Sequence, residues 1–190
     1  MTEILFSAAA LNDFGRNAPL PGPTSYCNDK VFGWQRLSGL DPMSLRRVTN
    51  LEQVPINVIH TINNSTLMHQ LNRRADLEVE IKHGNVFFVD YSIFNQIGHA
   101  IQRGELKKDK KLFLAAPYCL MIFDGETLVP VAIELDSQVF TAEQGERWEL
   151  AKFFVQVAAV NHHGLCAHEY GQHAMIGAFS VATPRNLHKE

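Results

Sequence analysis

Apolar residues recur at helical intervals along the last quarter of the chain. Between Trp148 and Ala182 they fall three or four positions apart, and the first proline after them is Pro184. This pattern predicts one long, largely buried helix that includes residues 144–175. Glu146 and Glu149 suit its beginning, because carboxylates interact favourably with the positive end of a helix dipole.

Shorter segments before this helix predict a mixture of elements. The run 57–82 predicts one or two short helices, and Asp41-Pro42 predicts a helix up to Thr49, since proline is favoured at the first helical position. Three apolar, β-prone segments predict strands at 86–89, 112–122 and 128–135. The last two flank the turn sequence Asp124-Gly125-Glu126 and predict a hairpin. The expected fold class is therefore mainly α with a small antiparallel β element.

The domain organisation is predicted from the distribution of proline and glycine. Residues 1–30 are expected to form an irregular arm, because 12–30 are dense in proline, glycine, asparagine and aspartate. Residues 31–190 are expected to form a single domain. No segment has the length and apolarity of a membrane-spanning helix, and the opening residues lack the basic region of a signal peptide.

Composition excludes some function classes. The chain is 46% hydrophobic and 19% charged, with a formal net charge of −3, so nothing favours binding to nucleic acid. The basic run 103–111 is interrupted by Glu105 and Asp109 and is interpreted as a solvated segment. Cysteines at 27, 119 and 166 form no metal-binding or disulfide pattern, which predicts reduced thiols and a cytoplasmic location.

Histidines carry the candidate chemistry. His163, His168 and His173 repeat every five residues, a spacing that separates them by roughly 140° on a regular α-helix. A π-type turn, with its i→i+5 bonds, would bring them together, and Gly164 or Gly171 would ease that distortion. Because imidazole binds iron, zinc, copper and nickel, His168 and His173 form the best candidate pair of metal ligands. The alternative is that these are ordinary histidines bonded to backbone or water.

Two other readings of conspicuous residues were weighed. The string HEYGQH places its histidines five apart, whereas a zinc protease helix needs them four apart, so zinc hydrolysis is disfavoured. Asp90 and Tyr91 could form a catalytic pair. The favoured interpretation is structural, with the aspartate capping a turn and the tyrosine packed with its hydroxyl hydrogen-bonded.

The segment from Trp148 to Leu187 resembles the histidine-helix signature of the lipoxygenases. The shared positions include the three histidines, together with Trp148, Ala151, Lys152, Val155, Phe179, Ala182, Thr183, Arg185 and Leu187. Two earlier segments agree in order: FGWQRLSGLDPMSLRRV at 32–48 and GNVFFVDYSIF at 84–94. Two further segments resemble the family in the same order, LFLAAPYCLMIF and LVPVAIELD. The resemblance covers most of the chain from about Asn12 onward.

The resemblance implies a non-haem iron dioxygenase that adds O₂ to polyunsaturated fatty acids. His168 and His173 match the two iron ligands supplied by the long helix, and His163 matches the first histidine of the signature, which is usually not a ligand. The apolar neighbours Phe153, Val157, Leu165 and Ile176 are possible lining residues of a substrate channel.

Departures from the family pattern leave two functions open. The family's remaining iron ligands lie further downstream, so the resemblance is to a truncated piece of a catalytic domain that ends just after the signature. Ala159 and the pair Gly177-Ala178 also differ from the residues usual in the family. The chain is expected to be either a lipoxygenase-like enzyme or a non-catalytic module that binds metal weakly or not at all. Exposed apolar surface is expected to cause self-association.

Overall fold

The computed structural model describes residues 25–62, 64–73, 75–104 and 114–186. They form a sheet of five antiparallel strands whose spatial order equals their order in the sequence. The strands are β1 Arg46–Arg47, β2 Val86–Asp90, β3 Tyr118–Phe123, β4 Leu128–Leu135 and β5 Gln138–Phe140. The helices before the last long one are α2 Asp29–Ser38, α3 Ile56–Thr61, α4 Asn64–Leu71, α5 Leu77–His83 and α6 Ile93–Gln102. The predicted fold class is confirmed.

The predicted hairpin is the centre of the sheet. β3 and β4 are antiparallel neighbours, and the turn between them is closed by Asp124, whose side chain accepts hydrogen bonds from the backbone N–H of Glu126 and Thr127. Leu120 pairs with Ala132, but Met121 pairs with Pro130, so β4 carries one extra residue, a β-bulge. Proline is tolerated here because a bulge leaves a backbone position outside the regular ladder.

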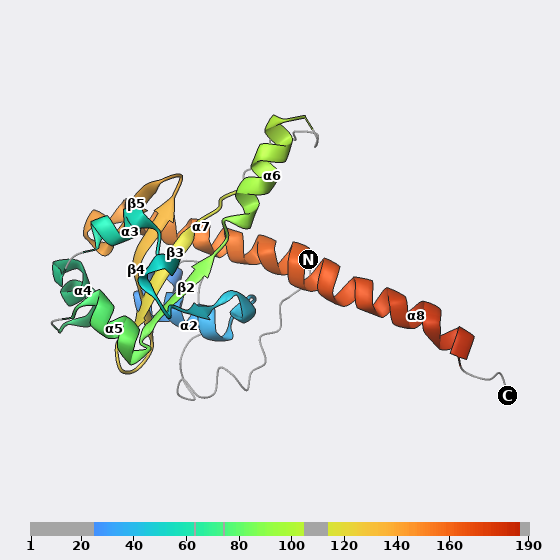
Figure 1. Ribbon diagram of the computed structural model, residues 1–190, viewed down its shortest axis with the longest axis horizontal. Coiled ribbons are helices and arrows are strands. Elements are labelled where there is room, and N and C mark those ends of the chain that lie inside the picture. The colour runs from blue at the N-terminus through green and yellow to red at the C-terminus, as the bar shows by residue number, and fades with distance from the viewer. Residues whose placement is uncertain (1–24, 63, 74, 105–113, 187–190) are drawn as a thin grey trace.

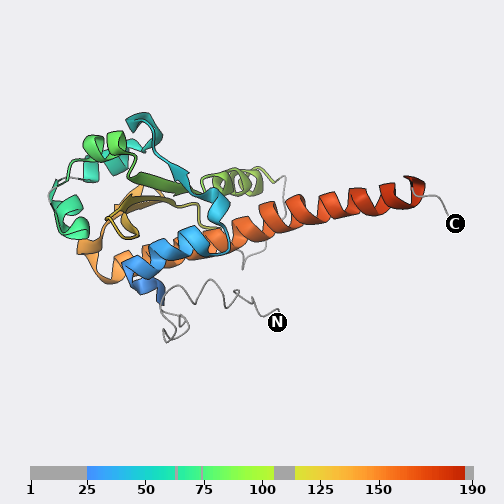
Figure 2. The same ribbon diagram turned by 90° about the horizontal axis from the view of Figure 1, so that it is seen from below.

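Helices cover both faces of the sheet. Leu120 and Ile122 of β3 pack with residues of α3, α4 and α5, whereas Cys119 and Met121 pack with residues of α2 and α7. Figure 2 shows α2 and α7 side by side on one side of the sheet, with α3 and α5 on the other. Because β3 is buried on both faces, its sequence is a continuous apolar run rather than an alternating one.

The long helix is present, and its outer half is exposed. It runs through α7 Glu146–His162, a π-helical segment His163–His173 and α8 Ala174–Asn186, with Pro184 inside α8. In Figure 1 it extends far beyond the sheet. α7 buries Trp148, Val155 and other residues, but almost every position from Leu165 onward is exposed. The prediction of a largely buried helix is therefore wrong for this half, since no described element packs against it.

Several predicted element boundaries are corrected. The helix expected from Pro42 to Thr49 is a single 3₁₀ turn, Pro42–Ser44, and the following arginines pair with β2 as β1. Residues 57–82 contain three helices rather than one or two, and the third strand begins at Tyr118 instead of residue 112. α6 and β5 were not anticipated. Of the predicted arm, residues 1–24 lie outside the described residues, while 25–27 form a 3₁₀ turn.

A buried ion pair joins α7 to α2. Lys152 is 1% exposed, and its Nζ lies 2.6 Å from Asp29 Oδ1 and 2.5 Å from the carbonyl oxygen of Cys27. The Asp29 carboxylate also accepts hydrogen bonds from Trp148 Nε1 and Gln70 Nε2. Three donors from two helices, α4 and α7, therefore converge on Asp29 in the first turn of α2, and the charge of Lys152 is matched where water cannot reach it.

Asp29→Asn should destabilise the fold strongly. The substitution leaves the Lys152 ammonium buried without a counter-charge, and breaking a buried pair in this way costs about 3–5 kcal/mol. Urea unfolding followed by circular dichroism measures the loss. Lys30→Ala is the matched control, because Lys30 pairs with Asp124 and Glu126 at the surface and its loss should leave the midpoint almost unchanged. Equal midpoints for the two variants would contradict this account.

Candidate metal centre

The histidine repeat lies in the π-helical segment. All three histidines of the five-residue repeat fall within His163–His173, and so do Gly164 and Gly171. The backbone enters and leaves this segment in right-handed helical geometry at His162 and Ala174, so the long helix is continuous through it. The predicted π distortion is confirmed. A π-helix places residue i+5 about one turn above residue i, which aligns the three rings along one side of the helix.

The two predicted ligands point their ring nitrogens toward one another. His168 Nε2 and His173 Nε2 are 3.2 Å apart, and the two rings meet edge to face with centroids separated by 4.8 Å. Two nitrogens that each lie about 2.1 Å from one metal ion are about 3.0 Å apart in an octahedron and about 3.4 Å apart in a tetrahedron. The observed distance between the two Nε2 atoms falls between these values, so it is compatible with both nitrogens binding one divalent cation.

His163 and Glu169 are the other polar groups beside this pair. The ring centroids of His163 and His168 are 6.2 Å apart, so His163 lies next to His168 but is not part of the close pair. The ligand atoms of His168, Glu169 and His173 all lie within 4.8 Å of one another, and all three residues are exposed. Sequence reasoning selected the histidines but not Glu169, because its place beside the pair depends on the π geometry.

A hydrogen-bond cluster fixes the point where α7 becomes π-helical. Asp41 is buried, and its Oδ2 accepts hydrogen bonds from Ser44 Oγ at 2.5 Å and from Tyr91 Oη at 3.2 Å. His162 Nδ1 lies 2.9 Å from the same oxygen. Aspartate, histidine and serine therefore meet, but Ser44 also contacts Nδ1, so they lack the arrangement of a hydrolytic triad, in which serine uses the other ring nitrogen.

The structural interpretation of Asp90 and Tyr91 is confirmed. Asp90 Oδ1 accepts a hydrogen bond from the backbone N–H of Ser92 at 2.8 Å, which caps the turn after β2. Tyr91 is completely buried, and burial raises the pKa of its hydroxyl, which donates to Asp41. Asp41 and His162 were not predicted as a pair. In the sequence, Asp41 and His162 were marked only by lying next to recognised motifs.

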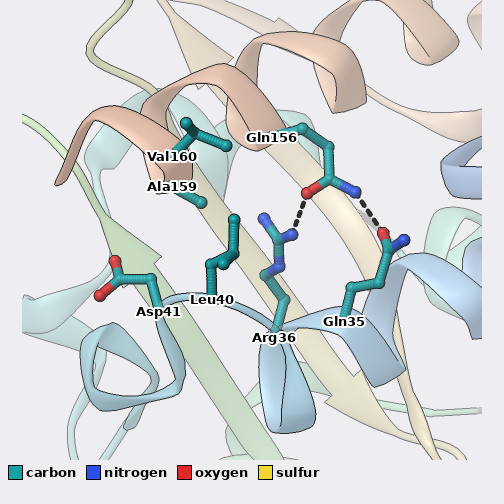
Figure 3. Close-up of a pocket in the computed structure, with 8 residues that line it drawn as sticks. Gln35, Arg36, Leu40, Asp41, Gln156, Ala159 and Val160 are labelled. Atoms are coloured by element: carbon teal, nitrogen blue, oxygen red, sulfur yellow. Dashed lines mark hydrogen bonds between the residues drawn. The ribbon is translucent and has the colours of Figure 1, made fainter. Parts of the chain in front are cut away.

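A cavity of about 500 Å³ adjoins this cluster. Its wall includes Asp41, Ser44 and His162, and it extends along the helix to Cys166 and Ala167 at the inner end of the π segment. A second, smaller cavity of about 130 Å³ lies between α2 and α7 (Figure 3). There Arg36 donates to Gln156 Oε1, and Gln156 in turn donates to Gln35. These contacts hold the two helices together beside the buried ion pair.

The predicted channel residues are distributed along the helix. Phe153 and Val157 lie on α7, Leu165 lies in the π segment and Ile176 lies on α8. Phe153 packs against Tyr26, with ring centroids 6.1 Å apart, whereas Leu165 and Ile176 are 52% and 58% exposed. The structure therefore does not gather these four residues around one cavity, and their role in a channel stays a prediction.

The family model described as Lipoxygenase matches residues 21–189. Hydroperoxide isomerase ALOXE3 from Homo sapiens is 30% identical over 85% of this chain, and polyunsaturated fatty acid lipoxygenase ALOX12 from Mus musculus is 29% identical over 92%. A calcium-dependent 11R-lipoxygenase superposes with a TM-score of 0.68 at 26% identity over 85% of the chain. The chain belongs to the lipoxygenase family.

The match covers only part of each relative. The chain spans 22% of the human hydroperoxide isomerase, 26% of the mouse lipoxygenase and 24% of the 11R-lipoxygenase chain. A lipoxygenase solved in complex with arachidonate gives a TM-score of 0.58 at 27% identity, covering 87% of this chain and 26% of that one. The shared part therefore consists of the sheet, the helices that cover it and the helix that carries the histidines.

The three thiols should differ sharply in reactivity. Cys166 is exposed, Cys27 is half-buried, and burial raises the pKa of the Cys119 thiol to about 12. Because the thiolate is the nucleophile, Cys119 should not react with a disulfide reagent at pH 8 until the protein is unfolded. Titration of the folded parent protein should give one fast phase, and this phase should be absent from the Cys166→Ser variant. Titration of the parent protein in denaturant should detect three thiols. Rapid reaction of Cys119 in the folded protein would contradict the described core.

Proposed function

We propose that this chain contributes the metal-binding helix of a lipoxygenase-type dioxygenase that oxidises polyunsaturated fatty acids. The observation that carries the proposal is the pair of ring nitrogens of His168 and His173, 3.2 Å apart on a π-helical turn. Membership of the family and the likeness to a lipoxygenase solved with arachidonate support the substrate class. Non-haem iron is the proposed metal, by the resemblance of the histidine signature.

The residues of this chain would bind the metal and orient its open side. His168 and His173 would donate their Nε2 atoms, and His163 would lie beside them without binding the metal. When bound, iron would supply the one-electron chemistry by which O₂ is added to a fatty acid. The hydrogen bond between Asp41 and His162 holds the start of the π segment against the sheet, which keeps the ligand pair at a fixed distance from the body of the protein.

The competing proposal is a non-catalytic module, and the exposure of the site favours it. Both ligand histidines face solvent, and the apolar residues that flank them are exposed as well. A dioxygenase benefits from a closed, apolar pocket that holds the fatty acid beside the metal and excludes water. The two functions are separated by measuring catalysis and metal content on the same preparation.

The chain loaded anaerobically with Fe(II) should consume O₂ and form conjugated diene from linoleate in proportion to bound iron. His168→Ala and His173→Ala should each lower both iron content and diene formation to background, because one neutral nitrogen binds the metal too weakly. His60→Ala, which removes an exposed histidine of α3, is the control and should keep both. No O₂ uptake and no conjugated diene, with iron bound weakly or not at all, would instead support the non-catalytic module.

We also propose that the chain self-associates through α8. Met175 and Phe179 are four residues apart, so they share one face of the helix, and they are 61% and 66% exposed. Exposed apolar surface of this kind usually recruits a partner.

No helix among the described residues is long and apolar enough to cross a membrane. The free cysteines support the expectation of a reducing, cytoplasmic environment.

Light scattering coupled to size-exclusion chromatography should show a dimer or larger species at micromolar concentration. The double variant Met175→Ser, Phe179→Ser should shift the population toward monomer, because it removes the apolar stripe of α8. Leu150→Ser is the control, since Leu150 is also an exposed apolar residue, at 53%, but lies on α7 beside the body of the protein. A monomeric parent protein at every concentration would exclude self-association.

A further inference from the structure

Arg36 is a buried arginine with one terminal nitrogen that no described residue engages. The residue is only 5% exposed, and burial lowers the pKa of its guanidinium, which nevertheless stays charged at neutral pH. Its Nη2 donates to Gln156 Oε1, but Nη1 is buried without a hydrogen-bond partner among the residues that the structure describes. A buried donor of a charged group costs more to leave unpaired than a neutral one, so Nη1 requires a further partner.

The positive charge of Arg36 is matched only in part. No ion pair joins Arg36 to a carboxylate within the described ranges of the chain. The ring of Phe32 lies 4.8 Å from Arg36 Cζ and offsets some of the charge by a cation–π contact. Asp41 attracts the guanidinium over a longer distance, but its Oδ2 is already engaged in the hydrogen-bond cluster at the start of the π segment. An anion in direct contact with Nη1 would therefore supply the missing counter-charge.

The unused nitrogen faces the cavity between α2 and α7. In Figure 3 one terminal nitrogen of Arg36 is bonded to Gln156, and the other points to the side on which Leu40 and Ala159 lie. The cavity volume of about 130 Å³ exceeds the roughly 30 Å³ that a water molecule occupies in the liquid, so a small anion fits. Its wall includes Val160, which is 53% exposed, so the cavity borders on solvent.

We propose that this cavity binds a small carboxylate anion, of the size of formate or acetate, through Arg36. Hydrogen bonds between a guanidinium and a carboxylate are charge-assisted and about twice as strong as neutral ones. A water molecule could accept the bond from Nη1 but would leave the charge unmatched. The bound carboxylate joins α2 to α7 beside the buried pair of Asp29 and Lys152, and the site is independent of metal binding.

Urea unfolding of the full chain in sodium formate, compared with sodium chloride at the same ionic strength, tests the site in metal-free buffer. A ligand that binds only the folded state raises the unfolding midpoint as its concentration increases. The midpoint of the parent protein should therefore rise with formate. Arg147→Gln, which removes an exposed arginine of α7, is the control and should keep this rise, whereas Arg36→Gln should lose it. Equal midpoints of the parent in the two salts would overturn the proposal.

A second pair of variants does not depend on the folding of Arg36→Gln. Ala159 is buried on the α7 wall of the cavity, so Ala159→Asp should place a carboxylate of the protein itself beside Arg36. Its midpoint in chloride should exceed that of the parent, and the added effect of formate should disappear. Saturation transfer from the protein to the formate proton, measured by NMR, should fall at least fivefold. Ala159→Asn has the same shape without the charge, and its midpoint in chloride should stay below that of Ala159→Asp.

Two results with the Ala159 variants would contradict an anion site. Equal midpoints of Ala159→Asp and Ala159→Asn in chloride would show that Nη1 needs only a neutral acceptor, as water provides. A rise with formate that persists in Ala159→Asp would be a general effect of the salt on stability. Either result would overturn the proposal and would leave the proposed binding of metal by the histidines untouched.

Discussion

The buried pair of Lys152 and Asp29 is the interaction on which the position of the long helix depends. A lysine ammonium inside a protein is stable only if its charge is matched and its donors are used, and here a carboxylate and a backbone carbonyl do both. Trp148, one turn earlier on the same helix, donates to the same carboxylate. These polar contacts therefore fix the rotation and the axial position of α7 against α2, together with the apolar packing of α7 on the sheet.

A second polar contact lies ten residues further along, where Asp41 holds His162. Ten helical residues span about 15 Å, so the two contacts fix α7 near its middle and at its C-terminal end. Beyond the second contact the backbone changes to π geometry, and the helix leaves the body of the protein. The segment that carries the candidate ligand histidines thus begins at a fixed point, although no described element packs against these histidines. Their mutual arrangement depends on the local helix, while their place relative to the sheet depends on Asp41.

The sequence predicted the elements whose signals are local. The five-residue histidine spacing is compatible with a shared helix face only if the helix widens, and the structure has a π segment there. It spans all eleven residues from His163 to His173 and is longer than the local turn expected at Gly164 or Gly171. The hairpin of β3 and β4 was predicted for a similar reason, since its turn residues and apolar runs are contiguous. The ion pair was not predicted, because Asp29 and Lys152 are separated by 123 residues and nothing local marks them as partners. The contact between Asp41 and His162 was not predicted for the same reason, because the two residues lie far apart in the sequence.

Burial was the property that sequence predicted least well. An apolar helix pattern indicates that a face can be buried, but the burial itself requires a neighbouring element, and none among the described residues covers α8. The same exposure makes the candidate metal ligands His168 and His173 accessible to solvent. Because the candidate ligands lie within six residues of one helix, their geometry requires a single π turn and no contact between distant segments. A metal site of this kind can form in a chain that spans about a quarter of its relatives, whereas an enclosed substrate channel needs walls from several elements. The proposed binding of metal and the proposed oxidation of a lipid therefore place different demands on the fold.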